Sequence, residues 1–287
     1  MLADFTARVT VETADWSEGV GARVVLNDTA LVLATGEDDS VTVPLSSVID
    51  VIVGVVPNVF DPLPGTPVTV AYRAEGGRVA ATVAAEERTI EKFATVLYKA
   101  MLNGTSVVLK HPAKVGGRVV DSEYRGGILS LSASAVQFET GEGPVTVPLS
   151  AVVDFDRETR TIDGDDRAVI VVSHVDDGTA LTTVAATETP RTLAILGRYL
   201  RQEYQSVLDA LSELSLSDPE TEMLTTLYSA GDMDVSLPSV LDADPKAVKR
   251  LLHALHRKGL VESGENGPVL TARGRIVVTE HLERIND

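Results

Sequence analysis

The sequence predicts an α+β protein in which two similar β-rich segments each end in a helix, and a smaller helical domain follows. Three observations predict this fold class. Residues 41–50 recur as residues 145–154 with eight of ten positions identical, which indicates a duplication. In both copies, short β-branched runs precede a hydrophobic pattern with the period of a helix. Residues 217–287 then combine several helical patterns with one hairpin pattern.

The first copy contains short β-branched runs separated by turn residues, a pattern typical of antiparallel strands. The predicted strands are 24–26, 31–33, 41–43, 48–56, 67–72 and 79–83. A hairpin turn at Gly76 and Gly77 joins the last two. The period then becomes helical, and the apolar face of this helix consists of Ile90, Phe93, Leu97, Tyr98 and Met101. Asn103 and Gly104 end the helix.

The second copy repeats this pattern, with strands at 168–174 and 180–184 around a turn at 176–178. Its helix begins at Pro190 and continues as a long connector over about residues 190–214, because large apolar residues recur three or four positions apart. Six or seven strands closed by a C-terminal helix are typical of pleckstrin-homology-like (PH-like) barrels. A lipocalin-like barrel and a β-sandwich remain alternatives for both copies.

The C-terminal segment has the pattern of a winged-helix domain. Ser217 and Glu220 form a capping-box pattern, and the helix that they open ends at Gly231. A short helix, a third helix, a hairpin and a final helix are predicted at 237–241, 245–258, 260–270 and 272–285. The core face of the third helix consists of Val248, Leu251, Leu252 and Leu255. The predicted domains are therefore 1–104, 105–214 and 217–287.

Composition and charge exclude some classes of chemistry and indicate the environment in which the protein works. The 287 residues include no cysteine, which excludes disulfides and thiolate chemistry and suits a reducing compartment. We expect a cytoplasmic protein without membrane insertion, since the sequence shows neither a signal peptide nor a long apolar span. Asp and Glu number 42 against 25 Lys and Arg, which gives a net charge of −17 spread along the chain. This bias favours a haloarchaeal source over an ordinary acidic bacterial protein.

The acidity predicts that high salt stabilises the protein. Repulsion between carboxylates extends over about 10 Å at 0.1 M salt but only about 3 Å at 1 M. We therefore expect a higher melting temperature in 1 M KCl than in 0.1 M KCl. Thermal melts at the two concentrations measure this, and equal midpoints would show that the net charge of −17 has no bearing on stability.

The sequence predicts no catalytic residue, no cofactor site and no metal site. His253 and His256 are three residues apart on a predicted helix, but no carboxylate signature accompanies them, so we interpret them as solvated. The run 163–166 lacks the ligand spacing of a calcium loop and is interpreted as a hairpin turn. Gly19 and Gly21 lack the third glycine of a dinucleotide site. We therefore expect that the protein is not an enzyme.

Two clusters of basic residues remain as candidate binding sites. The first cluster, interpreted as an interdomain linker and not as a lipid site, is Lys110, His111, Lys114 and Arg118. The second lies opposite the apolar stripe of the third C-terminal helix and is the candidate partner-docking face: Lys246, Lys249, Arg250, His253 and Arg257. The corresponding helix enters the major groove in DNA-binding relatives. Residues 217–287 nevertheless hold 8 cations and 12 anions, including Glu262 and Glu265 in the hairpin, so we expect no nucleic-acid partner.

The chain resembles the archaeal CheF family of taxis proteins. The resemblance rests on the repeated Val-Thr-Val-Pro-Leu-Ser-x-Val-x-Asp motif, the acidic bias, the C-terminal pattern and the segment 15–19. It extends over the whole chain and includes no catalytic signature. It implies an adaptor that links the chemotaxis proteins CheY, CheD and CheC to the archaellum proteins FlaC, FlaD and FlaE, so that the motor can reverse. The alternatives are a winged-helix transcription regulator with PH-like sensor domains and a module that binds a ligand in a barrel mouth.

Overall fold

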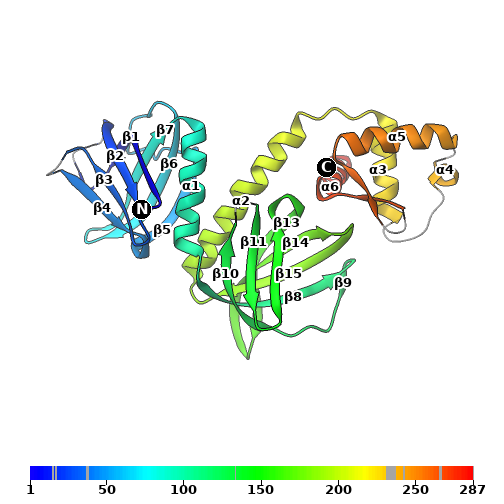
Figure 1. Cartoon of the computed structure of the whole chain (residues 1–287), viewed down its shortest axis with the longest axis horizontal. Coiled ribbons are helices and arrows are strands. Elements are labelled where there is room, and N and C mark those ends of the chain that lie inside the picture. The colour runs from blue at the N-terminus through cyan, green and yellow to red at the C-terminus, as the bar shows by residue number, and fades with distance from the viewer. Residues whose placement is uncertain are drawn as a thin grey trace. The chain divides into compact units, whose positions relative to one another are not determined.

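The computed structural model describes residues 1–14, 16, 18–36, 39–132, 134–230, 237–241, 243–264 and 267–286. Four sequence patterns lie partly outside the described residues. They are segment 15–19, the turn between the predicted strands 31–33 and 41–43, the predicted helix end at Gly231 and the predicted hairpin at Glu265. The chain divides into two compact units. One comprises Met1–Ser106, Ile128–Ala133 and Thr187–Gln202, and the other comprises Val107–Gly127, Ser134–Ala186 and Glu203–Asp287. Two large antiparallel sheets with a few helices confirm the α+β class (Figure 1).

The first sheet has seven strands in the order β4-β3-β2-β1-β7-β6-β5. The strands are β1 (Ala3–Val11), β2 (Val20–Leu26), β3 (Ala30–Ala34), β4 (Ser40–Pro44), β5 (Val48–Val53), β6 (Thr66–Ala74) and β7 (Gly77–Ala85). Strand β1 was not predicted; it pairs with β2 over residues 3–9 and with β7 over its last four residues. The sequence-based prediction also extended β5 three residues too far, because Gly54 takes a positive φ of 82° and ends the strand.

The second sheet has the same strand order, β12-β11-β10-β8-β15-β14-β13, and short strand β9 pairs with β8. Its strands are β8 (Thr105–Val115), β9 (Arg118–Val119), β10 (Arg125–Leu131), β11 (Ala135–Thr140), β12 (Gly143–Pro148), β13 (Val152–Ile162), β14 (Asp165–Asp176) and β15 (Thr179–Thr187). The predicted duplication is therefore confirmed at the level of topology. The expected hairpin turn is present and consists of Asp163 and Gly164, since Ile162 pairs with Asp165 and residues 165–166 already belong to β14.

The repeated motif builds the same local structure in both copies. Val43 in β4 and Val147 in β12 are both fully buried, as their equivalent positions predict. A 3₁₀ turn follows each strand, at η1 (Leu45–Ser47) and η2 (Leu149–Ala151). The next strand in each copy carries a register shift two residues after it begins, between Val48 and Asp50 and between Val152 and Asp154. The residues that are identical in the two copies of the repeat thus specify an edge strand, a turn and a β-bulge.

Helix α1 (Glu87–Leu102) covers the first sheet (Figure 1). Its buried face includes Ile90, Phe93 and Leu97, and the Phe93 ring meets the Phe5 ring edge-on at 5.3 Å between centroids. The Tyr98 hydroxyl donates a hydrogen bond to the Val51 carbonyl at 3.2 Å. Asn103 and Gly104 follow the last helical residue, as predicted. The apolar stripe of the helix therefore packs on the sheet, and its Tyr98 ring also contacts the Tyr199 ring at 5.4 Å between centroids.

Helix α2 (Pro190–Ser212) contributes residues to both units. In the first unit, the Arg191 side chain donates hydrogen bonds to the carbonyls of Leu45 and Val48. Arg198 forms an ion pair with Asp50 at 3.1 Å. These contacts cover backbone acceptors around β5, one of the two edge strands of the first sheet, which would otherwise remain open to pairing.

The C-terminal segment consists of α3 (Asp218–Ala230), α4 (Leu237–Val240), α5 (Pro245–Arg257), β16 (Val261–Gly264), β17 (Gly267–Leu270) and α6 (Ala272–Asn286). Its core includes Met223, Leu224, Leu255, Leu260 and Val278. The capping-box pattern forms only in part. The Ser217 backbone N–H and hydroxyl both donate to the Glu220 carboxylate at 2.9 Å, while the Glu220 N–H donates to the Ser217 carbonyl oxygen.

Candidate functional site

The predicted docking face lies on α5, and all five of its residues are exposed there. At about 100° of rotation per residue, these positions occupy one arc of about 100° and extend about 16 Å along the helix. We call this surface the basic face of α5; it consists of Lys246, Lys249, Arg250, His253 and Arg257. The opposite side packs into the C-terminal core, where Val248 and Leu255 are buried and Leu251 and Leu252 are partly buried.

The C-terminal end of α5 is fixed by Lys258, which follows the helix. Its ammonium group donates to the Glu220 carboxylate at 2.7 Å and to the Ser215 carbonyl at 2.9 Å. Burial raises the pKa of Glu220, but its hydrogen bonds with Lys258 and Ser217 outweigh this effect and hold the pKa below its usual value. The carboxylate therefore stays ionised and holds α3 and the end of α5 together.

Helix α5 contains no acidic residue. Among the residues that the structure describes, none of the four Lys and Arg side chains of the basic face forms an ion pair. Acidic side chains flank the helix instead: Asp244 is exposed just before it and Glu262 is exposed on β16. The basic face is thus a patch of unpaired cations bordered by anions.

A second polar cluster lies within the second sheet, and the sequence reading missed it. Lys110, His111 and Lys114 belong to β8 and Arg118 to β9, so their interpretation as a linker was wrong. The His111 ring stacks on the His174 ring of β14, with 5.8 Å between centroids and 13° between planes. In sequence, a strand with several basic residues looks the same as an exposed linker. Only the pairing of β8 within the sheet shows that this segment is a strand.

The two histidines share one hydroxyl. Thr183 Oγ1 on β15 lies 2.8 Å from His111 Nδ1 and 3.0 Å from His174 Nε2. A hydroxyl has one proton, so it donates to one ring and accepts from the other. His174 is almost fully buried, and its Nδ1 has no hydrogen-bond partner among the described residues. The arrangement therefore suits two neutral rings.

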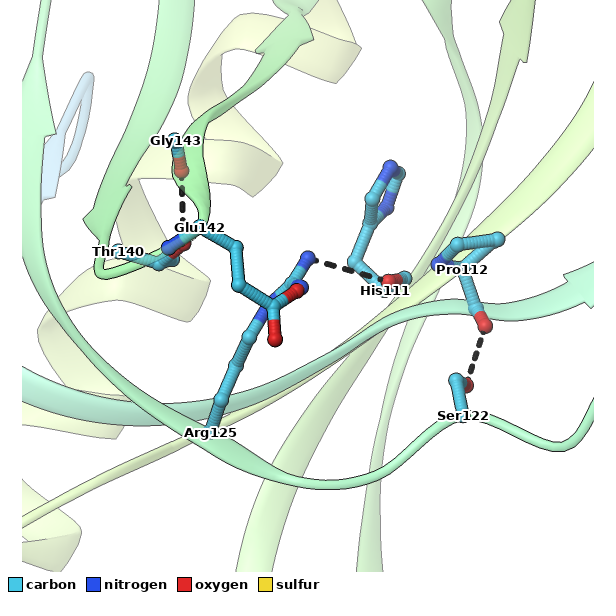
Figure 2. Close-up of polar contacts among 7 residues, drawn as sticks. All are labelled: His111, Pro112, Ser122, Arg125, Thr140, Glu142 and Gly143. Atoms are coloured by element: carbon cyan, nitrogen blue, oxygen red, sulfur yellow. Dashed lines mark hydrogen bonds and ion pairs between the residues drawn. The ribbon is translucent and has the colours of Figure 1, made fainter.

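Arg125 borders this cluster at the start of β10 (Figure 2). Its guanidinium forms an ion pair with Glu142 and donates to the His111 carbonyl at 3.3 Å. Nearby bonds fix the neighbouring turns: the Thr140 hydroxyl donates to the Gly143 carbonyl and the Ser122 hydroxyl donates to the Pro112 carbonyl. These groups are committed to holding loops and strands in place, which indicates a structural role.

The environment of the histidine pair disfavours protonation. The pKa of His174 is lowered from 6.5 to about 4, mainly by burial and also by His111, while Asp176 opposes the shift. Burial also lowers the pKa of His111, as does the positive charge of Arg125. Both rings are therefore neutral at pH 7.

This shift predicts a pH-dependent stability. As the pH falls below 6.5, the unfolded chain binds a proton at His174, whereas the folded chain does not until the pH reaches about 4. The free energy of unfolding therefore decreases across this window, by up to about 3 kcal/mol. Urea unfolding of the wild type and of His174→Gln at pH 7 and pH 5 measures the effect. The variant should lose part of the pH dependence, and the exposed control His253→Gln should keep it; equal dependence in all three would contradict the assignment.

Two open grooves were not predicted. One of about 620 Å³ lies between β1 and α1, with Leu2, Phe5, Phe93 and Val96 among its lining residues. Along it, residues 3–7 of β1 pair with β2 only. The other, of about 560 Å³, is lined by hydroxyl and carboxylate side chains of α3, including Asp218 and Glu222, together with Val240 and His281.

The described part of the chain holds no group of three or more His, Asp or Glu side chains placed to share a metal ion. His253 and His256 are both exposed on α5. Each helix, as far as it is described, is too short or too polar to cross a membrane.

Comparison with known proteins gives consistent matches. Residues 1–206 match the family described as "Archaeal Chemotaxis signal transduction system protein F" (CheF-arch). The chain is 35% identical over 285 residues to "Taxis protein CheF2" of Halobacterium salinarum, covering 99% of this chain and 98% of that protein. It is 27% identical to "Taxis protein CheF1" of the same organism, covering 95% of this chain and 91% of that protein.

Proposed function

The chain belongs to the CheF family of archaeal chemotaxis signal transduction proteins, and from this membership we propose that it is a non-catalytic adaptor. The adaptor couples the chemotaxis response regulator to the archaellum motor switch, so that the direction of rotation can change. The observation that supports this most is the family match across both duplicated sheets, together with a further C-terminal segment. Several separate surfaces on one chain suit a protein that binds several partners.

The proposal also includes the type of each domain. Each large sheet is a PH-like barrel: the order of its seven strands and the helix after the last strand support this. Residues 217–287 are a winged helix, supported by three helices, a two-stranded hairpin and a final helix in that order. PH-like barrels and winged helices bind partners through sheet edges and helix faces, and neither needs a cofactor.

The proposed partners are CheY, CheD and CheC on the signalling side and FlaC, FlaD and FlaE on the motor side. The basic face of α5 lies outside residues 1–206. The C-terminal segment therefore offers a binding surface in addition to the surfaces of the two duplicated sheets. Distinct surfaces would let the chain hold a signalling protein and a motor protein together.

A pull-down of the full-length chain from lysate at native salt, with and without nuclease, tests the proposal. We expect CheY and the motor proteins to be recovered in equal amounts with and without nuclease. Recovery of specific DNA fragments, with loss of protein partners after nuclease, would favour the transcription-regulator alternative. Recovery of neither class of protein would contradict the adaptor function.

A further inference from the structure

We propose that the basic face of α5 is a docking surface for an acidic surface of another protein. The inference rests on the proposed adaptor function and names the chemistry of one partner that the adaptor binds. All five residues of this face lie beyond residues 1–206, the part of the chain that the family model matches.

The charge distribution is the first argument. On a chain with a net charge of −17, helix α5 carries four Lys and Arg side chains and no carboxylate. They are exposed and form no ion pair among the described residues, so they keep their full capacity to pair with a partner. Opposite charge across an interface directs both the rate of association and the choice of partner.

The rigidity of the helix is the second argument. Val248 and Leu255 anchor α5 in the C-terminal core, and Lys258 ties its end to Glu220. A face about 16 Å long is therefore presented on a fixed backbone. A fixed backbone avoids the entropy cost of ordering a flexible segment on binding, although the Lys and Arg side chains still lose rotamer freedom. The length matches three turns of a partner helix bearing carboxylates.

The surroundings of α5 favour a protein over duplex DNA. DNA-binding helices of this kind place their N-terminal residues against base edges and phosphates. Here that end begins with the exposed Asp244, and the neighbouring hairpin strand exposes Glu262. Residues 217–287 hold 12 anions against 8 cations, so a phosphate backbone extending past the helix would be repelled. A compact acidic patch needs to contact only the basic face, and α5 itself carries no carboxylate.

Photo-crosslinking in living cells tests the inference. A photo-crosslinking amino acid is placed at His253, in the middle of the basic face, in the full chain. The test variant is Lys246→Glu, Lys249→Glu and Arg257→Glu. The control, Arg73→Glu, Arg78→Glu and Arg88→Glu, changes the net charge equally at exposed positions of the first unit. Adducts are digested and sequenced.

We expect an adduct to a protein segment rich in Asp and Glu, at least about tenfold weaker in the test variant and unchanged in the control. Amide hydrogen exchange checks that the test variant is folded; if it is not, Lys246→Gln, Lys249→Gln and Arg257→Gln replaces it, with a smaller loss expected. A DNA adduct, no adduct, or a protein adduct insensitive to charge reversal would overturn the inference. If the pull-down still recovers the proposed partners, the adaptor function stands and only this docking surface fails.

Discussion

Replacing Gly274 by alanine is expected to destabilise the C-terminal segment by about 3 kcal/mol. A Cβ atom at this position of α6 would lie only 2.1 Å from the Leu260 carbonyl oxygen. Leu260 is fully buried, and the same carbonyl accepts the Thr271 N–H at 3.1 Å. Because the clash is with backbone, no rotation of a side chain relieves it, and α6 must move away from the core.

Hydrogen exchange is the measurement for the Gly274 variant. Amides of α5 and α6 should lose protection, while amides of β1 to β7 in the first unit keep theirs. Gly126→Ala is the matched control, since its added Cβ meets no atom within 4 Å and should cost less than about 0.5 kcal/mol. Unchanged protection of α6 in the Gly274 variant would mean that the close approach of α6 to Leu260 does not restrict position 274 to glycine.

The second large effect is expected at Phe93. Its side chain is 2% exposed and meets Phe5 edge-on, so Phe93→Ala removes a ring from the packing between α1 and the first sheet. We expect a loss of about 3 to 5 kcal/mol in the free energy of unfolding. Urea unfolding at constant salt measures it. The exposed neighbour Lys92 is the control, and Lys92→Ala should fall within about 0.5 kcal/mol of the wild type. A loss below about 1 kcal/mol at Phe93 would contradict the packing of this helix.

The repeat and the hydrophobic periods predicted most of the fold. An eight-of-ten match over residues 41–50 requires equivalent structure, and both sheets have the same strand order. Strand β1 was missed because its inward positions include Ala3 and Ala7, and alanine has little preference for strands. It is recognised only through its pairing with β2 and β7, and the β7 residues are about 70 positions away in sequence.

The two candidate clusters differ in what the sequence can reveal. The basic face of α5 follows from the helical period alone, which places Lys246, Lys249 and Arg257 opposite the apolar stripe. The histidine pair depends on long-range pairing, because His111 and His174 meet only once β8 and β14 both lie beside β15. A period of two fixes which face a strand residue occupies, but the residue opposite depends on the register.

As the proposed adaptor, this chain would let the motor change direction. The most direct measurement is the tracking of swimming cells that lack the chain, with the wild-type chain restored as the comparison. The adaptor function predicts cells whose motors assemble and rotate but do not reverse, before or after a stimulus, and restoration should return reversals. Normal reversal frequency in cells without the chain would contradict the claim.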